Sequence, residues 1–394
     1  MWWKICKGLS ALVMVAAAFL IFIHVRQLDD GGDPRVNTQL ETPALVLVEE
    51  IQPSHTEPAE HEDDQEKLSV DSITLEIPEA EQNQPVEQTA YAGPIRCTQY
   101  AWEEVYRNLS QYPNAKKEIS KNGSRINISN PEGETFYIGP GRIAYLFSSS
   151  SNQLFELTSY PTQTASRDRE LIQEGRNALS AEIDGMSREE AEQSMEALMD
   201  SLFQSDRYHA KAVNIYGYTG AHLKRLHQML YKKRADWSYF YKEFPSEAED
   251  GLHYIEMQLY IDDIPVCTEN EALGIHYSVN STYYIQSTIA RLVLSSDRVI
   301  YLDVSYEYDL SGIEKIDLLA EEQIQQMIEE DLENNVLIRS TDGMQKRLLY
   351  LYIQNGIGDH ATYELRPAWC VQTSTKEDED YQAFYDAASG ELLF

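Results

Sequence analysis

Two short segments near the end of the chain carry the most specific structural signal: LRPAW at residues 365–369 and YQAFYDAASGELL at residues 381–393. Pro367 and Trp369 are expected to end or bend an edge strand over the core. Asp386 and Gly390 are residues that allow a tight turn between two strands. The end of the chain is therefore predicted to be an antiparallel hairpin whose residues are structural.

Apolar and polar residues alternate through much of the remaining sequence, which predicts β-strands. Strands are expected at residues 125–129, 134–139, 142–148, 210–218, 237–244, 254–261, 348–353, 363–371 and 382–385, with a long hairpin at 283–308 that turns at 295–297. Helical spacing predicts helices at residues 166–183, 187–203, 221–234 and 320–332. The second helix opens with Ser187 followed by Glu190, which is a capping-box pattern. Helices that alternate with groups of strands predict an α+β fold, with antiparallel sheets each packed against one or two helices.

The terminal hairpin, with the helix at residues 320–332 and the strand at 348–353 before it, resembles PepSY-type domains. It also resembles the membrane-anchored regulators of cell-wall histidine kinases, and a looser similarity at residues 187–266 implies two PepSY-like units in tandem. The layout of the whole chain is similar to a family of secreted proteins of unknown function in Gram-positive bacteria. The resemblance implies a protein that binds or restrains partners outside the membrane, among them a membrane sensor, and it transfers no catalytic residue.

The composition excludes several classes of function. The 394 residues include 32 Lys and Arg against 65 Asp and Glu, a formal charge of −33. Such a charge repels the phosphate backbone of nucleic acids. The four cysteines contain no C-x-x-C pair, which argues against zinc ribbons, thioredoxin-like redox chemistry and disulfide scaffolds.

The start of the chain is predicted to be a membrane anchor within residues 1–26. The apolar run at residues 9–25 would span about 25 Å as a helix, marginally enough to cross a bilayer. Lys4 and Lys7 precede the run and acidic residues follow it, so the N-terminus is expected in the cytoplasm and the rest of the chain outside. A cleaved signal peptide is the alternative, because the run is short and its start is basic.

The region from residue 27 to residue 92 is predicted to be a disordered stalk. It holds 17 acidic and two basic residues together with scattered prolines. Self-repulsion and a lack of apolar residues oppose folding of such a segment. Two extracytoplasmic α+β domains are expected to follow, at residues 93–270 and at residues 271–394, the second of them PepSY-like.

A basic island interrupts the acidic body, because no Asp or Glu occurs between Asp206 and Asp236. The candidate residues for binding a partner or an anion are Lys211, Lys224, Arg225, Lys232, Lys233 and Arg234. One interpretation is that these residues hold an anionic lipid, a cell-wall polymer or an acidic protein partner. The other is that they balance the stalk or neighbouring carboxylates of the same protein, and the sequence leaves both open.

The sequence contains no motif typical of serine acylation or nucleotide binding. His222 and His227 are five residues apart, a spacing that directs the two rings to different sides of a helix. Cys370 is interpreted as a buried strand residue rather than a nucleophile. Residues 262–263 and 377–380 are interpreted as turns rather than as an acid/base pair and a calcium site. No catalytic residue, metal or cofactor is therefore expected.

These features favour a non-enzymatic, membrane-anchored, extracellular protein that binds or regulates a protein or peptide partner at the cell envelope. The first alternative is a cell-envelope hydrolase whose catalytic residues are dispersed in the sequence. A purely structural envelope protein is the second alternative.

Overall fold

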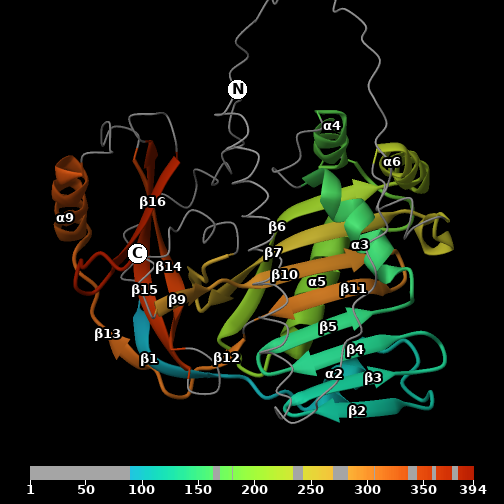
Figure 1. Ribbon diagram of the computed structural model, residues 1–394, viewed down its shortest axis with the longest axis horizontal. Coiled ribbons are helices and arrows are strands. Elements are labelled where there is room, and N and C mark those ends of the chain that lie inside the picture. The colour runs from blue at the N-terminus through green and yellow to red at the C-terminus, as the bar shows by residue number, and fades with distance from the viewer. Residues whose placement is uncertain are drawn as a thin grey trace, which may run out of the picture. The chain divides into compact units, whose positions relative to one another are not determined.

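The computed structural model describes residues 89–162, 169–179, 181–233, 243–268, 283–305, 307–335, 344–356, 361–374 and 380–394 (Figure 1). These residues form two antiparallel β-sheets accompanied by a small number of helices. The prediction of a mixed α+β fold with antiparallel sheets is confirmed at this level. The predicted anchor and most of the predicted stalk lie outside the described residues, and the described helices are all too short or too polar to span a bilayer.

The larger sheet contains nine of the described strands. They are β2 (Glu118–Asn122), β3 (Arg125–Ser129), β4 (Thr135–Gly139), β5 (Arg142–Leu146), β6 (Tyr208–Tyr218), β7 (Leu252–Ile261), β8 (Ile264–Pro265), β10 (Ile289–Leu294) and β11 (Val299–Ser305). Their order is β2-β3-β4-β5-β11-β10-β7-β6, with β8 paired to β7. The predicted alternation is clear in β5, where Ile143 and Tyr145 are buried and Arg142 is exposed.

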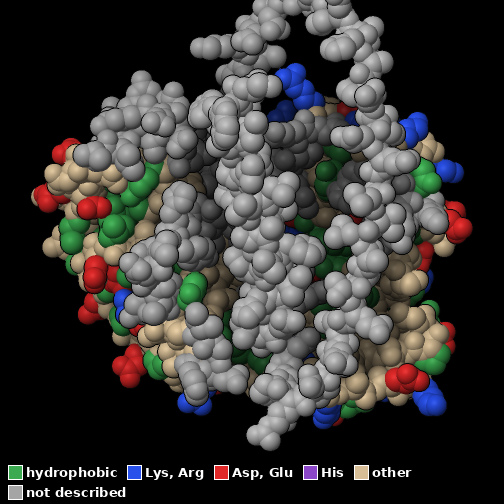
Figure 2. All heavy atoms as spheres, in the orientation of Figure 1, with side chains coloured by type: hydrophobic (Ala, Val, Ile, Leu, Met, Phe, Trp, Pro, Cys, Tyr) green, Lys and Arg blue, Asp and Glu red, His purple; other side chains and the backbone are tan. Residues whose placement is uncertain are grey.

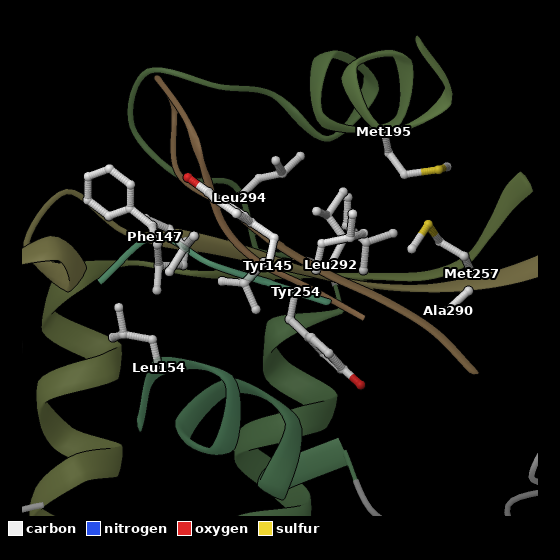
Figure 3. Close-up of a cluster of buried hydrophobic side chains, with 14 of the residues drawn as sticks. Tyr145, Phe147, Leu154, Met195, Tyr254, Met257, Ala290, Leu292 and Leu294 are labelled. Carbon is white, nitrogen blue, oxygen red and sulfur yellow. The ribbon is translucent and has the colours of Figure 1, made fainter. Parts of the chain in front are cut away.

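Helices cover both faces of the larger sheet. They are α2 (Trp102–Leu109), α3 (Ser151–Ser159), α4 (Arg169–Ala178), α5 (Arg188–Leu202) and α6 (Gly220–Lys233). Figure 3 shows the sheet between Met195 of α5 on one side and Leu154 of α3 on the other, and both side chains are fully buried. Leu292 of the central strand β10 lies in the same core. Burial of both faces explains why the core residues of this sheet come from almost every element of the chain before residue 305.

The smaller sheet contains seven of the described strands. They are β1 (Ala90–Cys97), β9 (Tyr283–Gln286), β12 (Tyr308–Asp309), β13 (Glu314–Ile316), β14 (Gln345–Asn355), β15 (Thr362–Ser374) and β16 (Asp380–Asp386). Their order is β12-β1-β15-β14-β9, with β13 paired to β1 and β16 paired to β15. The predicted terminal hairpin is present as the β15–β16 pair, in which Trp369 lies opposite Tyr385.

Among the described helices, α9 (Glu321–Asn334) packs on this smaller sheet. Its buried residues are Ile324, Ile328 and Leu332, which recur every four positions and form one stripe. The stripe contacts Val371 of β15 and Ala383 of β16 in one hydrophobic cluster. The opposite side of α9 therefore faces solvent.

The chain passes from one sheet to the other more than once, so neither sheet is formed by one continuous stretch of sequence. β1, from the start of the body, lies in the smaller sheet, whereas β10 and β11 lie in the larger sheet although they follow residue 271. The predicted division into domains at residues 93–270 and 271–394 stays a prediction. Each of the two sheets contains strands from both of these ranges. β1 also begins at Ala90, inside the last residues of the range assigned to the stalk.

The connection between the sheets passes through the segment after β8. The Cys267 backbone N–H donates to the Tyr350 carbonyl at 2.9 Å, and the Thr288 N–H donates to the Cys267 carbonyl at 2.9 Å. Tyr208 of β6 and Tyr352 of β14 share a buried hydrogen bond between their hydroxyl groups at 2.9 Å. The Tyr308 backbone N–H donates to the Tyr208 hydroxyl at 3.1 Å, so the junction is both hydrogen-bonded and aromatic.

Two strand predictions need correction. The hairpin expected over residues 283–308 extends only over β10 and β11, because β9 pairs with β14 and β12 pairs with β1 in the other sheet. Pro367 does not lie in an edge strand, because β15 has neighbours on both sides. On one side β15 pairs with β14 along its length. On the other side it pairs first with β1 and then with β16, and Pro367 lies between these two pairings. A proline is tolerated there because its missing N–H interrupts neither of those two pairings.

The remaining predictions vary in accuracy. The structure has α2, α3, β1 and β2, which the sequence did not indicate, and α4 is shorter than the helix expected at residues 166–183. The strand expected at 237–244 and the acidic loop at 377–380 fall mainly outside the described residues. The capping box of α5 is confirmed: the Ser187 hydroxyl accepts from the Glu190 backbone N–H, and the Glu190 carboxylate accepts from the Ser187 N–H at 2.8 Å.

Loss of this cap gives a test of the local argument. The substitution Ser187→Ala is expected to lower the free energy of unfolding by about 1 kcal/mol, because it removes the side-chain acceptor for the first turn of α5. The matched control is Ser194→Ala in the exposed interior of the same helix, which should leave stability unchanged or slightly higher. Urea denaturation followed by circular dichroism compares the two variants, and equal effects would contradict the capping role.

Candidate functional site

The basic residues of α6 lie on its solvent side, as the helical pattern predicts. Leu223, Leu226 and Leu230 are fully buried in the core of the larger sheet. The exposed residues include the candidates Lys224, Arg225, Lys232 and Lys233. Arg234, the last candidate, lies outside the described residues.

Carboxylates of α4 neutralise part of this basic surface. Glu174 forms an ion pair with Arg225 and lies 2.6 Å from Nε2 of His222, and Glu170 lies 2.6 Å from Nζ of Lys233. For these cations the structure supports the interpretation that they balance neighbouring carboxylates of the same protein. The more exposed of these pairs, between Glu170 and Lys233, contributes little to stability by itself.

The remaining candidates are separated from one another. Lys211 lies near the start of β6, with its ammonium group 4.7 Å from the centre of the Tyr260 ring. The helix α6 begins after the other end of β6, roughly 20 Å away along the strand. Within the part of the chain described here, Lys224 and Lys232 remain as exposed cations of α6 that form no ion pair, and they are about 12 Å apart along the helix.

A groove lies between α9 and the turn that ends the chain. Its cavity volume is about 330 Å³, and it is lined by Met327, Glu330, Asp331, Asn334, Tyr385, Gly390 and Leu392. Met327 is 40% exposed and Leu392 is 47% exposed, which is high for large apolar side chains. Figure 2 shows hydrophobic side chains next to acidic ones over the region of α9 and β16.

The four helical residues of the groove form a second stripe of α9. Met327 is followed at three and four residues by Glu330 and Asp331, and at seven residues by Asn334, so these side chains share one face. All six ionisable residues of α9 are acidic. The groove therefore combines two exposed apolar side chains with a negatively charged wall.

Hydrogen bonds fix both walls of the groove. The Tyr385 hydroxyl donates to Oδ2 of Asp331 at 2.7 Å, which ties β16 to α9. Asp386 stabilises the terminal turn, because its Oδ1 accepts from the Ala388 and Ser389 backbone N–H groups, each at 2.9 Å. The predicted role of Asp386 in a tight turn is thus confirmed.

Gly390 has a specific place in this arrangement. Its φ of +76° lies in the left-handed region, which favours glycine. A Cβ atom at this position would lie 2.3 Å from Cε of Met327. A side chain at residue 390 would therefore require the flexible end of Met327 to move, in addition to the backbone strain of a positive φ, which the sequence alone did not reveal.

Two buried carboxylates illustrate different local environments. Glu134, between β3 and β4, accepts four hydrogen bonds, from Ser110, Asn130 and Tyr145 side chains and from the Gln111 N–H, all between 2.6 and 2.7 Å. It holds the loop after α2 against the sheet. Saturated buried groups of this kind are structural.

The carboxylate of Glu307, at the junction of the sheets, accepts two hydrogen bonds from described residues. Tyr100 donates its hydroxyl at 2.7 Å and Gln204 its backbone N–H at 2.9 Å. Burial raises the pKa of Glu307 to about 7, because desolvation outweighs the two hydrogen bonds that lower it. This carboxyl group therefore titrates near neutral pH beside the tyrosines that connect the sheets.

The raised pKa predicts a pH-dependent stability. Between the ordinary pKa of 4.5 and the folded value of about 7, the folded protein binds a proton that the unfolded chain releases. The free energy of unfolding is expected to fall as the pH rises through this window, by up to about 3 kcal/mol from this group.

The substitution Glu307→Gln tests this expectation, because the amide stays neutral and can bond to the same two partners. The stability of the variant relative to the wild type should increase between about pH 5 and about pH 8. Urea denaturation of the full chain in detergent at the two pH values measures the difference. A difference that does not change with pH would contradict the assignment.

Two of the residues considered for catalysis, Cys370 and Asp262, have structural surroundings in the fold. Cys370 is buried in β15, and burial raises the pKa of its thiol to about 11, which disfavours the reactive thiolate. Cys97, Cys267 and Cys370 all lack a disulfide partner. Asp262, in the turn between β7 and β8, pairs with Arg207 at 2.5 Å.

The histidines are also engaged within the fold. His227 is buried, with its ring centre 5.8 Å from that of Phe244, whereas His222 pairs with Glu174. The described part of the chain contains no group of three or more His, Cys, Asp or Glu side chains placed to hold a metal ion.

Comparisons with known proteins add no relative. The chain gives no significant match to a protein-family model, to a curated protein or to a solved structure.

Proposed function

We propose that the protein is a non-enzymatic, membrane-anchored protein of the cell envelope whose extracytoplasmic body binds or regulates a protein or peptide partner. The observation that carries this proposal is the groove between α9 and the terminal turn. Isolated apolar side chains are common on protein surfaces, but Met327 and Leu392 line one groove. Contiguous exposed apolar surface rimmed by polar residues is typical of interaction sites.

The predicted anchor and stalk give the proposal its location. A chain tethered at residues 9–25 by a flexible stalk of 66 residues would hold its body roughly 45 Å from the membrane, and further if charge repulsion extends the stalk. Partners within that reach include membrane sensors and other envelope proteins. The similarity of the hairpin to membrane-anchored regulators of histidine kinases supports the same choice.

The basic surface of α6 supports a partner less strongly. Anionic lipid or a cell-wall polymer was the alternative ligand for these residues, yet Arg225 and Lys233 already pair with carboxylates of α4. Within the described residues, the groove carboxylates Glu330 and Asp331 form no ion pair with a cation. The groove is therefore the preferred docking surface.

Photo-crosslinking in intact cells tests the proposal. A photoreactive amino acid at Met327 of the full-length protein is expected to crosslink to one defined envelope protein, which mass spectrometry can identify. The control carries the same amino acid at Val213 of β6, which is 48% exposed and far from α9 in sequence. Identical products at both positions, or no product at Met327, would reject the groove as the docking surface and with it the support for this function.

A further inference from the structure

We infer that the groove between α9 and the terminal turn receives a partner segment in which an apolar side chain is flanked by Lys or Arg. This inference rests on the proposed function and adds the chemistry of the partner. It follows from the size of the groove, the charge of its walls and the way in which those walls are held.

The size of the groove indicates a short segment rather than a flat domain surface. Its volume of about 330 Å³ is at the lower end of the range for ligand pockets, roughly 300 to 1,000 Å³. A groove of this size holds one or two side chains. Met327 and Leu392 would contact the apolar side chain, and the flexible thioether of methionine adapts to the shape of an incoming residue.

The charge of the walls selects the flanking residues. Glu330 and Asp331 are exposed, line the groove and belong to a helix that carries six carboxylates and no cation. Lys346, a cation close to α9, lies 3.0 Å from Glu321 at the start of the helix, away from the groove. A cationic segment therefore meets complementary charge at the groove, whereas an acidic segment is repelled.

The walls of the groove are organised before a partner arrives. Tyr385 ties β16 to Asp331, and the Leu319 backbone N–H donates to the Ala387 carbonyl at 3.0 Å, which ties the start of α9 to the terminal turn. The terminal turn packs closely against the end of the Met327 side chain at Gly390. A site with fixed walls loses less conformational entropy when it binds a segment.

Peptide display on the full-length protein in nanodiscs tests the inference. Short random peptides on phage are selected against the wild type, and the selected peptides are synthesised for anisotropy measurements. The expected peptides carry Lys or Arg next to Leu, Met or Phe. Met327→Ser and Glu330→Lys are each expected to weaken binding of these peptides about tenfold or more. The first substitution removes the apolar contact, and the second reverses a charge that attracts the basic residues of the peptide.

Two matched variants control for nonspecific effects. Val213→Ser removes an equally exposed apolar side chain from β6, and Glu196→Lys reverses an exposed charge on α5. Neither is expected to change the affinity of the selected peptides. This control matters because a protein with a charge of −33 attracts cationic peptides over its whole surface.

The other outcomes overturn the inference in distinguishable ways. Peptides that lack Lys and Arg but depend on Met327 would leave the groove as a docking site, and with it the proposed function, while rejecting the cationic partner. Equal weakening by Glu196→Lys and Glu330→Lys would show general attraction instead of a site. Self-association of the wild type that Met327→Ser abolishes would identify a second copy of the chain as the occupant.

Discussion

The buried hydroxyl group of Tyr208 connects the two sheets of the protein, together with the backbone hydrogen bonds of Cys267. It accepts a hydrogen bond from the Tyr308 backbone N–H and shares one with the Tyr352 hydroxyl, inside a buried hydrophobic cluster that contains all three tyrosines. Burial raises the pKa of Tyr208, so the group stays neutral and able to donate. Polar groups buried in this way must find partners, and here only the correct pairing of the two sheets supplies them. The chain passes between the sheets more than once, and this path brings Tyr208 of one sheet next to Tyr308 and Tyr352 of the other.

The negative charge of the protein is distributed unevenly, and this distribution bears on function. The carboxylates of α4 form ion pairs with two cations of the basic island, Arg225 and Lys233, so these two cations are engaged within the body. On α9 the carboxylates have few cationic neighbours, and they surround exposed apolar side chains instead. The charges between α4 and α6 are partly neutralised by each other. The surface of α9 instead offers exposed apolar side chains and unneutralised negative charge, both of which favour binding of a partner.

Sequence patterns located elements well where the structure depends on local periodicity. The strands β3, β4 and β5 and the terminal pair β15 and β16 follow from alternation and turn residues, and the start of α5 follows from its capping box. The candidate residues on α6 were correctly expected to face solvent. The sequence could not show that two of them are already paired, because the carboxylates that engage them come from α4, 51 and 63 residues earlier in the chain.

The sequence by itself determined the class of fold, the acidic character and the presence of a hairpin at the end of the chain, because these depend on composition and on spacing between near neighbours. Only the tertiary structure decided which strands share a sheet and which surface stays open. Pro367 illustrates the first point, since its place between two partner strands depends on β1, more than 250 residues away. Met327 illustrates the second: its exposure depends on where Gly390 and Leu392 fold back against α9. Contacts between residues so far apart in the chain leave no periodic trace in the sequence.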